Sequence, residues 1–280
     1  MNKLLSAGFA RLWKSTLFWL EVILMTLFFV LIMIADHQSA RDYGVSYVLD
    51  VFFPGSFMFI GFFTAAFAAM FLGTEYSDGA IRNKLVMGHG RTAIYLSNLI
   101  VCFVSSVLVC LSSIVIICAM GIPMFGLLTR PLANTLAVVS TGILIVAAYS
   151  AVFTFIAMLI SNKPVTVIVC AFVILTLYFG AMTIGMMLDA PEISPGYAWI
   201  EEGETVTSLP HPNPHYLRGT KRAVYEFLYD FLPTGQGFQI AAGEEGAIPS
   251  TKIQFPLYSL LITVSVTAGG VLAFCRKDLK

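Results

Sequence analysis

The sequence predicts an all-α integral membrane protein with six transmembrane helices. The chain of 280 residues is 58% apolar and 11% charged, with a mean hydropathy of +0.85. Soluble domains are typically about 45–50% apolar and about 25% charged, which argues against a water-soluble fold. Six runs are long enough to cross a bilayer core, which takes about 20 helical residues, and none alternates like the strands of a membrane β-barrel. The runs are Leu17–Ile34, Val51–Leu72, Leu99–Gly121, Leu136–Ile160, Val165–Leu188 and Pro256–Phe274.

The segment Met1–Lys14 predicts a short amphipathic helix before the first span. Its apolar side chains are interspersed with Lys3, Arg11 and Lys14. Such a helix lies in the membrane interface with its cations toward anionic lipid; the alternative is a frayed start of the first span. The first run is longer than the roughly 7–15-residue core of a signal peptide, and no convincing cleavage site follows it, so we interpret it as an uncleaved span.

The basic residues predict that both termini are cytoplasmic. The short loops that would then lie outside contain only Arg41 and Arg130. Since cytoplasmic segments carry an excess of Lys and Arg, this asymmetry predicts the orientation of the chain in the membrane. The basic residues of the long loop before the last span have little weight in this rule. The basic residues of the inner segments are Lys3, Arg11, Lys14, Arg82, Lys84, Arg91, Lys163, Arg276, Lys277 and Lys280.

The connection Gly73–Asn98, between the second and third spans, is a charged island in a chain that is otherwise nearly free of charge. A simple turn needs no such residues, so the segment is predicted to contact a partner. Ser77 or Asp78 is expected to cap a short helix, because a side-chain oxygen there accepts the free N–H groups of the first turn. Asp78 and Arg82 are four residues apart and are expected to pair on one face.

The apolar side of this short helix is expected at Ile81 and Leu85, and Gly88 is its expected left-handed stop. The sequence EYSDGAIRNKLVMGHGRTAIY in this island resembles a segment of the ABC-2 family of ABC-transporter permeases. In that family an acidic-aromatic pair, a G-x-I-R-x-K-L core and a G-x-x-R-x-x-I-Y run lie between the second and third membrane helices. There they form a coupling helix that sits in a groove of a separate ATPase subunit.

The resemblance therefore implies a type V exporter-like permease with a cytoplasmic coupling helix at about residues 73–95. Such permeases also carry an amino-terminal interfacial helix and a large outer loop between helices five and six. The residues implied to couple the chain to the ATPase are Glu75, Tyr76, Asp78, Ile81, Arg82, Lys84, Leu85, Arg91 and Tyr95.

The resemblance also implies the assembly. Two permease subunits, identical or different, would work with two copies of the ATPase in a bacterial plasma membrane. ATP and Mg would bind to that partner, because this chain contains no G-x-x-x-x-G-K-[ST] phosphate loop. The chain itself is expected to be no enzyme, to hold no cofactor or metal, and to contact membrane lipid but no nucleic acid.

The implied function is ATP-driven export, and the apolar spans favour an amphipathic or hydrophobic cargo. Relatives of this size suggest peptides, such as toxins or bacteriocins that are exported or removed for self-immunity. Drug or lipid efflux stays open, as does a membrane sensor or assembly protein that transports nothing. An ion-driven secondary transporter would usually show several charges inside the membrane.

Few polar residues lie within the spans. Glu21 is the only acidic one, and it is interpreted either as a member of a structural ion pair or as a gating residue. Tyr149 and Thr154 in the fourth span, and Tyr178 and Thr183 in the fifth, are possible path-lining residues. The alternative is that they form hydrogen bonds between neighbouring helices.

The chain is expected to divide into residues 1–188 with spans one to five, an extracellular loop region at 189–254, and residues 255–280 with the last span and a cytoplasmic tail. Within the loop region, Lys221–Leu232 predicts a short amphipathic helix on or in the outer leaflet. His211 and His215 flank two prolines that disfavour a helical zinc-binding pair, so we interpret them as part of a solvated loop.

Overall fold

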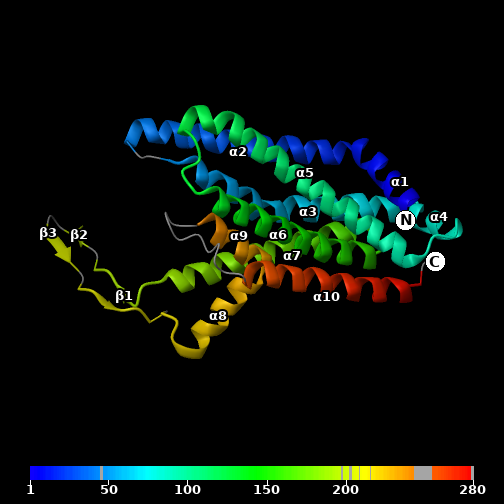
Figure 1. Ribbon diagram of the computed structural model, residues 1–280. Helices are drawn as coiled ribbons and strands as arrows, with labels where there is room; N and C mark the ends of the chain where they lie inside the picture. Colours follow the sequence, from blue (N-terminus) through cyan, green and yellow to red (C-terminus); the bar gives the residue numbers. More distant parts are fainter. Residues whose placement is uncertain are drawn as a thin grey trace.

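The computed structural model describes residues 1–44, 47–196, 198–201, 204–207, 209–214, 216–242 and 254–278. These residues form a helical bundle with two small β-ribbons at one end (Figure 1). The elements are α1 (Asn2–Trp13), α2 (Thr16–Tyr43), the 3₁₀ turn η1 (Leu49–Val51), α3 (Phe52–Ser77), α4 (Ala80–Val86), α5 (Arg91–Phe125), α6 (Leu132–Leu159), α7 (Lys163–Asp189), β1 (Ile193–Ser194), β2 (Ala198–Glu201), β3 (Glu204–Thr207), β4 (His211–Pro212), α8 (Gly219–Phe231), α9 (Pro233–Ala241) and α10 (Gln254–Arg276).

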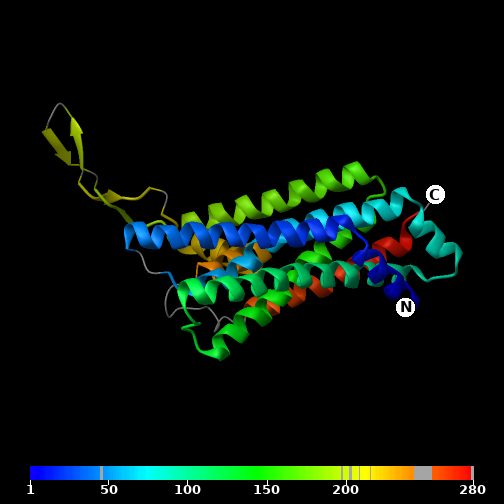
Figure 2. The same ribbon diagram turned by 90° about the horizontal axis from the view of Figure 1, so that it is seen from above.

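Within the described residues, six helices are long and apolar enough to cross a membrane, which confirms the predicted spans. They are α2, α3 with the preceding η1, α5, α6, α7 and α10. Both termini lie at the end of the bundle that carries α4, and the β-ribbons extend from the opposite end (Figures 1 and 2). We call these the α4 end and the ribbon end.

The amino-terminal segment forms a helix of its own, as predicted, and is not a frayed start of the first span. A new helix begins after Ser15, whose side chain accepts a 3.5 Å hydrogen bond from the backbone N–H of Phe18. Leu12 is fully buried, and α1 packs along α5, where Gly8 lies against Val101. The position of α1 therefore depends on the bundle and not only on α2.

The second span, α3, lies at the centre of the bundle and packs against α5, α6, α7 and α9. Small side chains such as Ala65 and Ala68 are buried on it, and small residues allow helix backbones to approach closely in a membrane. The Thr64 hydroxyl donates a 2.9 Å hydrogen bond to Ser106 Oγ, which joins α3 to α5. This central position brings α3 into contact with most of the other spans.

The described residues between α7 and α10 contain two helices, of which the sequence predicted one. The first, α8, confirms the helix expected over residues 221–232. The second, α9, returns into the bundle against α3, α6 and α7. Its Gln236 is fully buried, donates a 2.9 Å hydrogen bond to the carbonyl of Asp230 and accepts one of 2.6 Å from Ser259 Oγ. The sequence PTGQGFQIA has too little apolar periodicity to predict such a buried helix.

The described residues between α7 and α8 include two antiparallel ribbons. In one, β1 pairs with β4, and in the other, β2 pairs with β3. Both extend away from the helices at the ribbon end (Figure 2). The histidine pair stays a prediction, because His215 lies outside the described residues.

Candidate functional site

The short helix α4 is flanked by glycines and lacks the predicted side-chain cap. Gly79 precedes it with a left-handed backbone (φ 68°), and no side chain caps the helix. Ser77 donates instead to the carbonyl of Thr74, and Asp78 ends α3, so the predicted capping role is wrong. Gly88 has a φ of 82°, which confirms the predicted left-handed stop.

The two faces of α4 differ from the expected arrangement. Ile81 is only 1% exposed, and Leu85 is partly buried against the same core, so neither is the most exposed apolar side chain of α4. The outward side chains are Arg82 and Asn83, followed by Val86 and Met87, which are 81% and 69% exposed. The exposed apolar surface of this element is therefore Val86 with Met87, which the sequence analysis missed.

Arg82 also differs from its predicted role. The four ion pairs found in the described part of the chain do not include Asp78 with Arg82. Both side chains are exposed, and that of Val86 is exposed as well. Together with Asn83 and Met87 they make up what we call the outer face of α4: Asp78, Arg82, Asn83, Val86 and Met87.

The carboxylate of Glu75 is the centre of a buried ionic cluster beneath α4. Glu75 Oε1 accepts from Arg11 Nη1 at 2.8 Å and from Lys84 Nζ at 2.6 Å, and its Oε2 accepts from Asn98 Nδ2 at 2.9 Å. Arg11 also donates to the carbonyl of Phe71 at 2.8 Å. The cluster therefore joins α1, α3, α4 and α5 through one side chain.

The ion pairs of the Glu75 cluster are largely buried, so their stability depends on their geometry. The side chain of Glu75 is 3% exposed and that of Lys84 is 14% exposed. A buried ion pair is stable only where good geometry and further hydrogen bonds offset the loss of hydration, and both oxygens of Glu75 have such partners. Glu75 and Lys84 thus hold α4 in place from inside the subunit and do not form its outer surface.

Two residues at the start of α5 hold the end of the last span. Arg91 Nη1 donates to the carbonyls of Phe274 at 3.3 Å and Cys275 at 3.0 Å, and also to that of Lys277. These are carbonyls at the carboxyl end of α10, where a cation also complements the helix dipole. Tyr95 is fully buried and packs with its ring centroid 6.2 Å from that of Phe274. Both residues therefore act between helices of the same subunit.

The carboxyl terminus contacts the last turn of α3. Lys277 Nζ donates to Tyr76 Oη at 2.9 Å and to the carbonyl of Met158 at 3.1 Å, and Tyr76 donates to the same carbonyl. Partial burial lowers the pKa of Lys277 to about 8, because desolvation disfavours the charged ammonium. Tyr76 therefore links the ends of α3, α6 and α10.

A cavity of about 450 Å³ lies between α4 and the carboxyl terminus. It leaves open space beside α4. Its lining residues are Tyr76, Ser77, Gly79, Ile81, Arg82, Ser161 and Asp278.

The possible path-lining residues do not share one surface. Tyr149 and Thr154 are buried inside the subunit, so they line no open path in this arrangement of the chain. Tyr178 packs between Phe62 and Phe238, with centroid distances of 4.9 Å to each ring. Thr183 is exposed and donates to a carbonyl of its own helix. Among these residues only Thr183 lies on the outside of the bundle.

Glu21 does not form the structural ion pair that was one of its two interpretations. Its side chain is buried in α2, and Oε1 has no hydrogen-bond partner among the described residues. An ionised carboxylate without partners is costly in such a place. The gating interpretation therefore stays a prediction.

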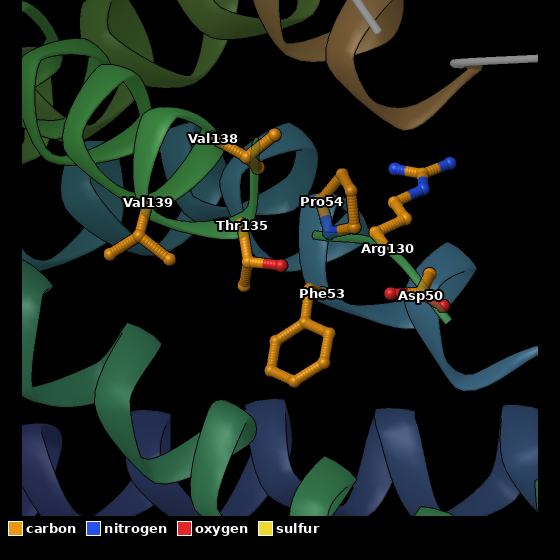
Figure 3. A pocket seen from close by; sticks show the side chains of 7 residues that line it. All are labelled: Asp50, Phe53, Pro54, Arg130, Thr135, Val138 and Val139. Carbon is orange, nitrogen blue, oxygen red and sulfur yellow. The ribbon is translucent and has the colours of Figure 1, made fainter. Parts of the chain in front are cut away.

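A small pocket at the ribbon end is structural. Figure 3 shows Val138 and Val139 on one side of it and Asp50 and Arg130 on the other. Asp50 is buried and accepts from the N–H and the hydroxyl of Thr129, at 2.8 and 2.6 Å. The pocket volume of about 10 Å³ is close to that of a single water site, so the residues join two loops and leave no room for a larger ligand.

A family model described as ABC-2 family transporter protein matches residues 4–178. The matched range covers more than half of the chain and includes α4 and the Glu75 cluster. No curated protein sequence matches the chain at a significant level. The chain therefore belongs to the ABC-2 family of transporter proteins, and it is an integral membrane subunit of an ABC transporter.

Proposed function

We propose that this subunit is the permease of an ABC exporter and that the outer face of α4 binds the ATPase. Membership of the family implies an ABC ATPase as a partner. The observation that carries the proposal is the division of α4 into two faces: Ile81 and Lys84 are held inside, whereas Val86 and Met87 are exposed. An apolar pair flanked by Arg82 and Asn83 is suited to a groove with a polar rim.

The internal contacts supply a route for movement. In this proposal ATP and Mg bind only to the ATPase, and closure of two ATPase subunits displaces α4. The Glu75 cluster transmits that displacement to α1, α3 and α5, and Arg91 with Tyr95 transmits it to α10. Two permease subunits then exchange an inward-facing for an outward-facing packing, since packed helices switch between discrete arrangements.

The orientation follows from the same site. We place the α4 end, with both termini, in the cytoplasm, because an ATPase has access to ATP there. The basic residues support this side: Arg11, Lys84, Arg91, Lys163 and Lys277 lie in or beside elements of the α4 end.

The cargo we propose is an amphipathic or hydrophobic peptide, in a bacterial plasma membrane. The support is the apolar character of the exposed side chains on the spans, such as Phe172, Phe179 and Met186 on α7, which suits neither an ion nor a sugar. Drug or lipid efflux is the alternative within transport, and a sensor that transports nothing is the alternative outside it.

The test is copurification with the cognate ATPase. The double variant Val86→Glu/Met87→Glu should lose the ATPase, because two carboxylates in an apolar groove are left without partners. Leu209→Glu is the matched control, since Leu209 is 82% exposed but lies at the ribbon end. Equal thermal stability of the three proteins excludes misfolding as the cause. Binding retained by the double variant would refute the assignment of the outer face.

The cargo is tested with the intact complex in vesicles. Amphipathic peptides should stimulate ATP hydrolysis at least as strongly as drugs or free lipids of similar apolar area. Stimulation by drugs or lipids alone would favour the efflux alternative. The absence of any ATPase partner would favour the sensor.

A further inference from the structure

The cavity at the α4 end is bounded by three segments that are far apart in the sequence. Besides residues from the end of α3 and from α4, it is lined by Ser161 in the turn between α6 and α7 and by Asp278 after α10. Its volume of about 450 Å³ lies in the range of about 300–1,000 Å³ that is usual for ligand pockets. The cavity is therefore large enough to admit a long side chain of another molecule.

Asp278 is held at this cavity by the residue before it. Lys277 Nζ donates to Tyr76 Oη at 2.9 Å and to the carbonyl of Met158 at 3.1 Å, and it lies 4.2 Å from the centre of the Tyr76 ring. The backbone carbonyl of Lys277 accepts from Arg91. Because the side chain and the backbone of Lys277 are both bound to the bundle, the carboxyl end of the chain is a fixed part of the cavity wall.

Two charges of opposite sign line the cavity, and neither is neutralised within the subunit. Arg82 and Asp278 are both exposed, and neither belongs to any of the ion pairs formed among the described residues. Ser161 is exposed as well and adds a hydroxyl to the same wall. A partner that brings one basic and one acidic side chain would pair with both charges.

The cavity is continuous with the outer face of α4. Arg82 belongs to both, since it lines the cavity and lies on the exposed side of the helix. Val86 is four residues further along α4, which is about 6 Å along the helix axis. A protein that covers Val86 and Met87 therefore also reaches the rim of the cavity.

We propose that the ATPase contact extends from the outer face of α4 to the carboxyl end of the chain, and that a basic side chain of the ATPase enters this cavity. The inference rests on the docking of the ATPase proposed above. The inserted lysine or arginine pairs with Asp278, and Arg82 pairs with an acidic residue of the ATPase at the rim. Charge complementarity of this kind determines which partner is accepted more than how tightly it binds. The second contact thus selects the cognate ATPase.

Photo-crosslinking of the complete complex in membranes tests the position of this contact. A photoreactive amino acid at Ser161 should crosslink to the cognate ATPase, although Ser161 lies outside α4. The same amino acid at Met87 reports on the docking of α4 itself. Crosslinks from Met87 alone would overturn this inference and leave the proposed function intact. Crosslinks from neither position would overturn both.

Charge reversal tests the pairing. Asp278→Lys should weaken binding of the ATPase by about two- to fivefold, as expected for the loss of an exposed ion pair. Asp42→Lys is the matched control, because Asp42 is an exposed aspartate at the other end of the bundle, in the last turn of α2. Changing the basic ATPase residue nearest to the Ser161 crosslink to aspartate should restore binding to the Asp278→Lys variant.

Two further results would overturn the inference. Unchanged binding of Asp278→Lys, at the thermal stability of the unaltered chain, would show that no basic side chain of the ATPase pairs with Asp278. Crosslinks from Ser161 that stay within the subunit would assign the cavity to the chain itself.

Discussion

Arg11, in the amino-terminal helix, forms a 2.8 Å ion pair with Glu75 at the end of the second span. The same oxygen of Glu75 accepts from Lys84 in α4 at 2.6 Å. The amino-terminal helix and the helix proposed to dock on the ATPase are therefore fixed to one carboxylate. A displacement of α4 that keeps this cluster intact must also move α1.

Glu75→Gln should destabilise the subunit. The change leaves Arg11 and Lys84 without a counter-charge, and breaking a buried pair in this way costs about 3–5 kcal/mol. Because the Arg11 side chain is 33% exposed, we expect the lower end of that range. Thermal unfolding in detergent measures the effect. Asp78→Asn, at an exposed position nearby, should change stability by no more than about 0.5 kcal/mol, and an equal loss in both variants would contradict the role of the cluster.

Two adjacent glycines in α10 should respond differently to alanine. A Cβ atom at Gly270 would lie 2.0 Å from Tyr95 Oη, whereas nothing lies within 4 Å of one at Gly269. Gly270→Ala should therefore cost about 1–3 kcal/mol through overpacking. Gly269→Ala should be neutral or slightly stabilising, because alanine is the better helix former. Equal unfolding temperatures for the two variants would show that Tyr95 does not hold α10 as described.

Lys277 should make stability depend on alkaline pH. Its pKa is lowered from the ordinary 10.5 to about 8, so between these values the unfolded chain binds more protons than the folded one. The free energy of unfolding that depends on Lys277 therefore rises as the pH increases from about 8 to 10.5. Below pH 8 this contribution does not change with pH. The measurement is the difference in unfolding temperature between the unaltered chain and Lys277→Met across pH 7–10.5. A difference that does not change with pH would contradict the lowered pKa.

Glu21→Gln should leave stability unchanged or raise it. The carboxylate has an oxygen without a partner among the described residues, and glutamine keeps its shape without the charge. Thermal unfolding separates this expectation from a structural ion pair, whose loss would lower the unfolding temperature. If the unfolding temperature is kept, transport by the complete complex then tests the gating interpretation.

The spans could be predicted from the sequence because each one is a long apolar run, and the helices of the structure match these runs to within a residue or two or extend beyond them. It was also sufficient to locate the charged island around α4. It could not divide the residues of that island into inner and outer faces. Val86 and Met87 follow the same apolar pattern as Ile81 and Leu85, and only the contacts of α4 with α3 and α5 determine which pair is buried.

Contacts between residues far apart in the chain could not be predicted from the sequence either. Arg91 is 184 residues from Cys275, and no local pattern relates a residue at the start of one span to the end of another. The helix α9 was missed for a different reason: its burial depends on Gln236, whose amide is satisfied by Asp230 and Ser259 within the fold. A buried polar residue with partners from other elements cannot be recognised by hydrophobic periodicity.

Photo-crosslinking from single positions of α4 tests the central claim most directly. A photoreactive amino acid at Met87, on the outer face, should crosslink to the cognate ATPase in membranes. The same amino acid at Leu85, on the inner face, should yield crosslinks only within the subunit. Crosslinks to the ATPase from Leu85 but not from Met87, or from neither position in an active complex, would contradict the docking surface and the function built on it.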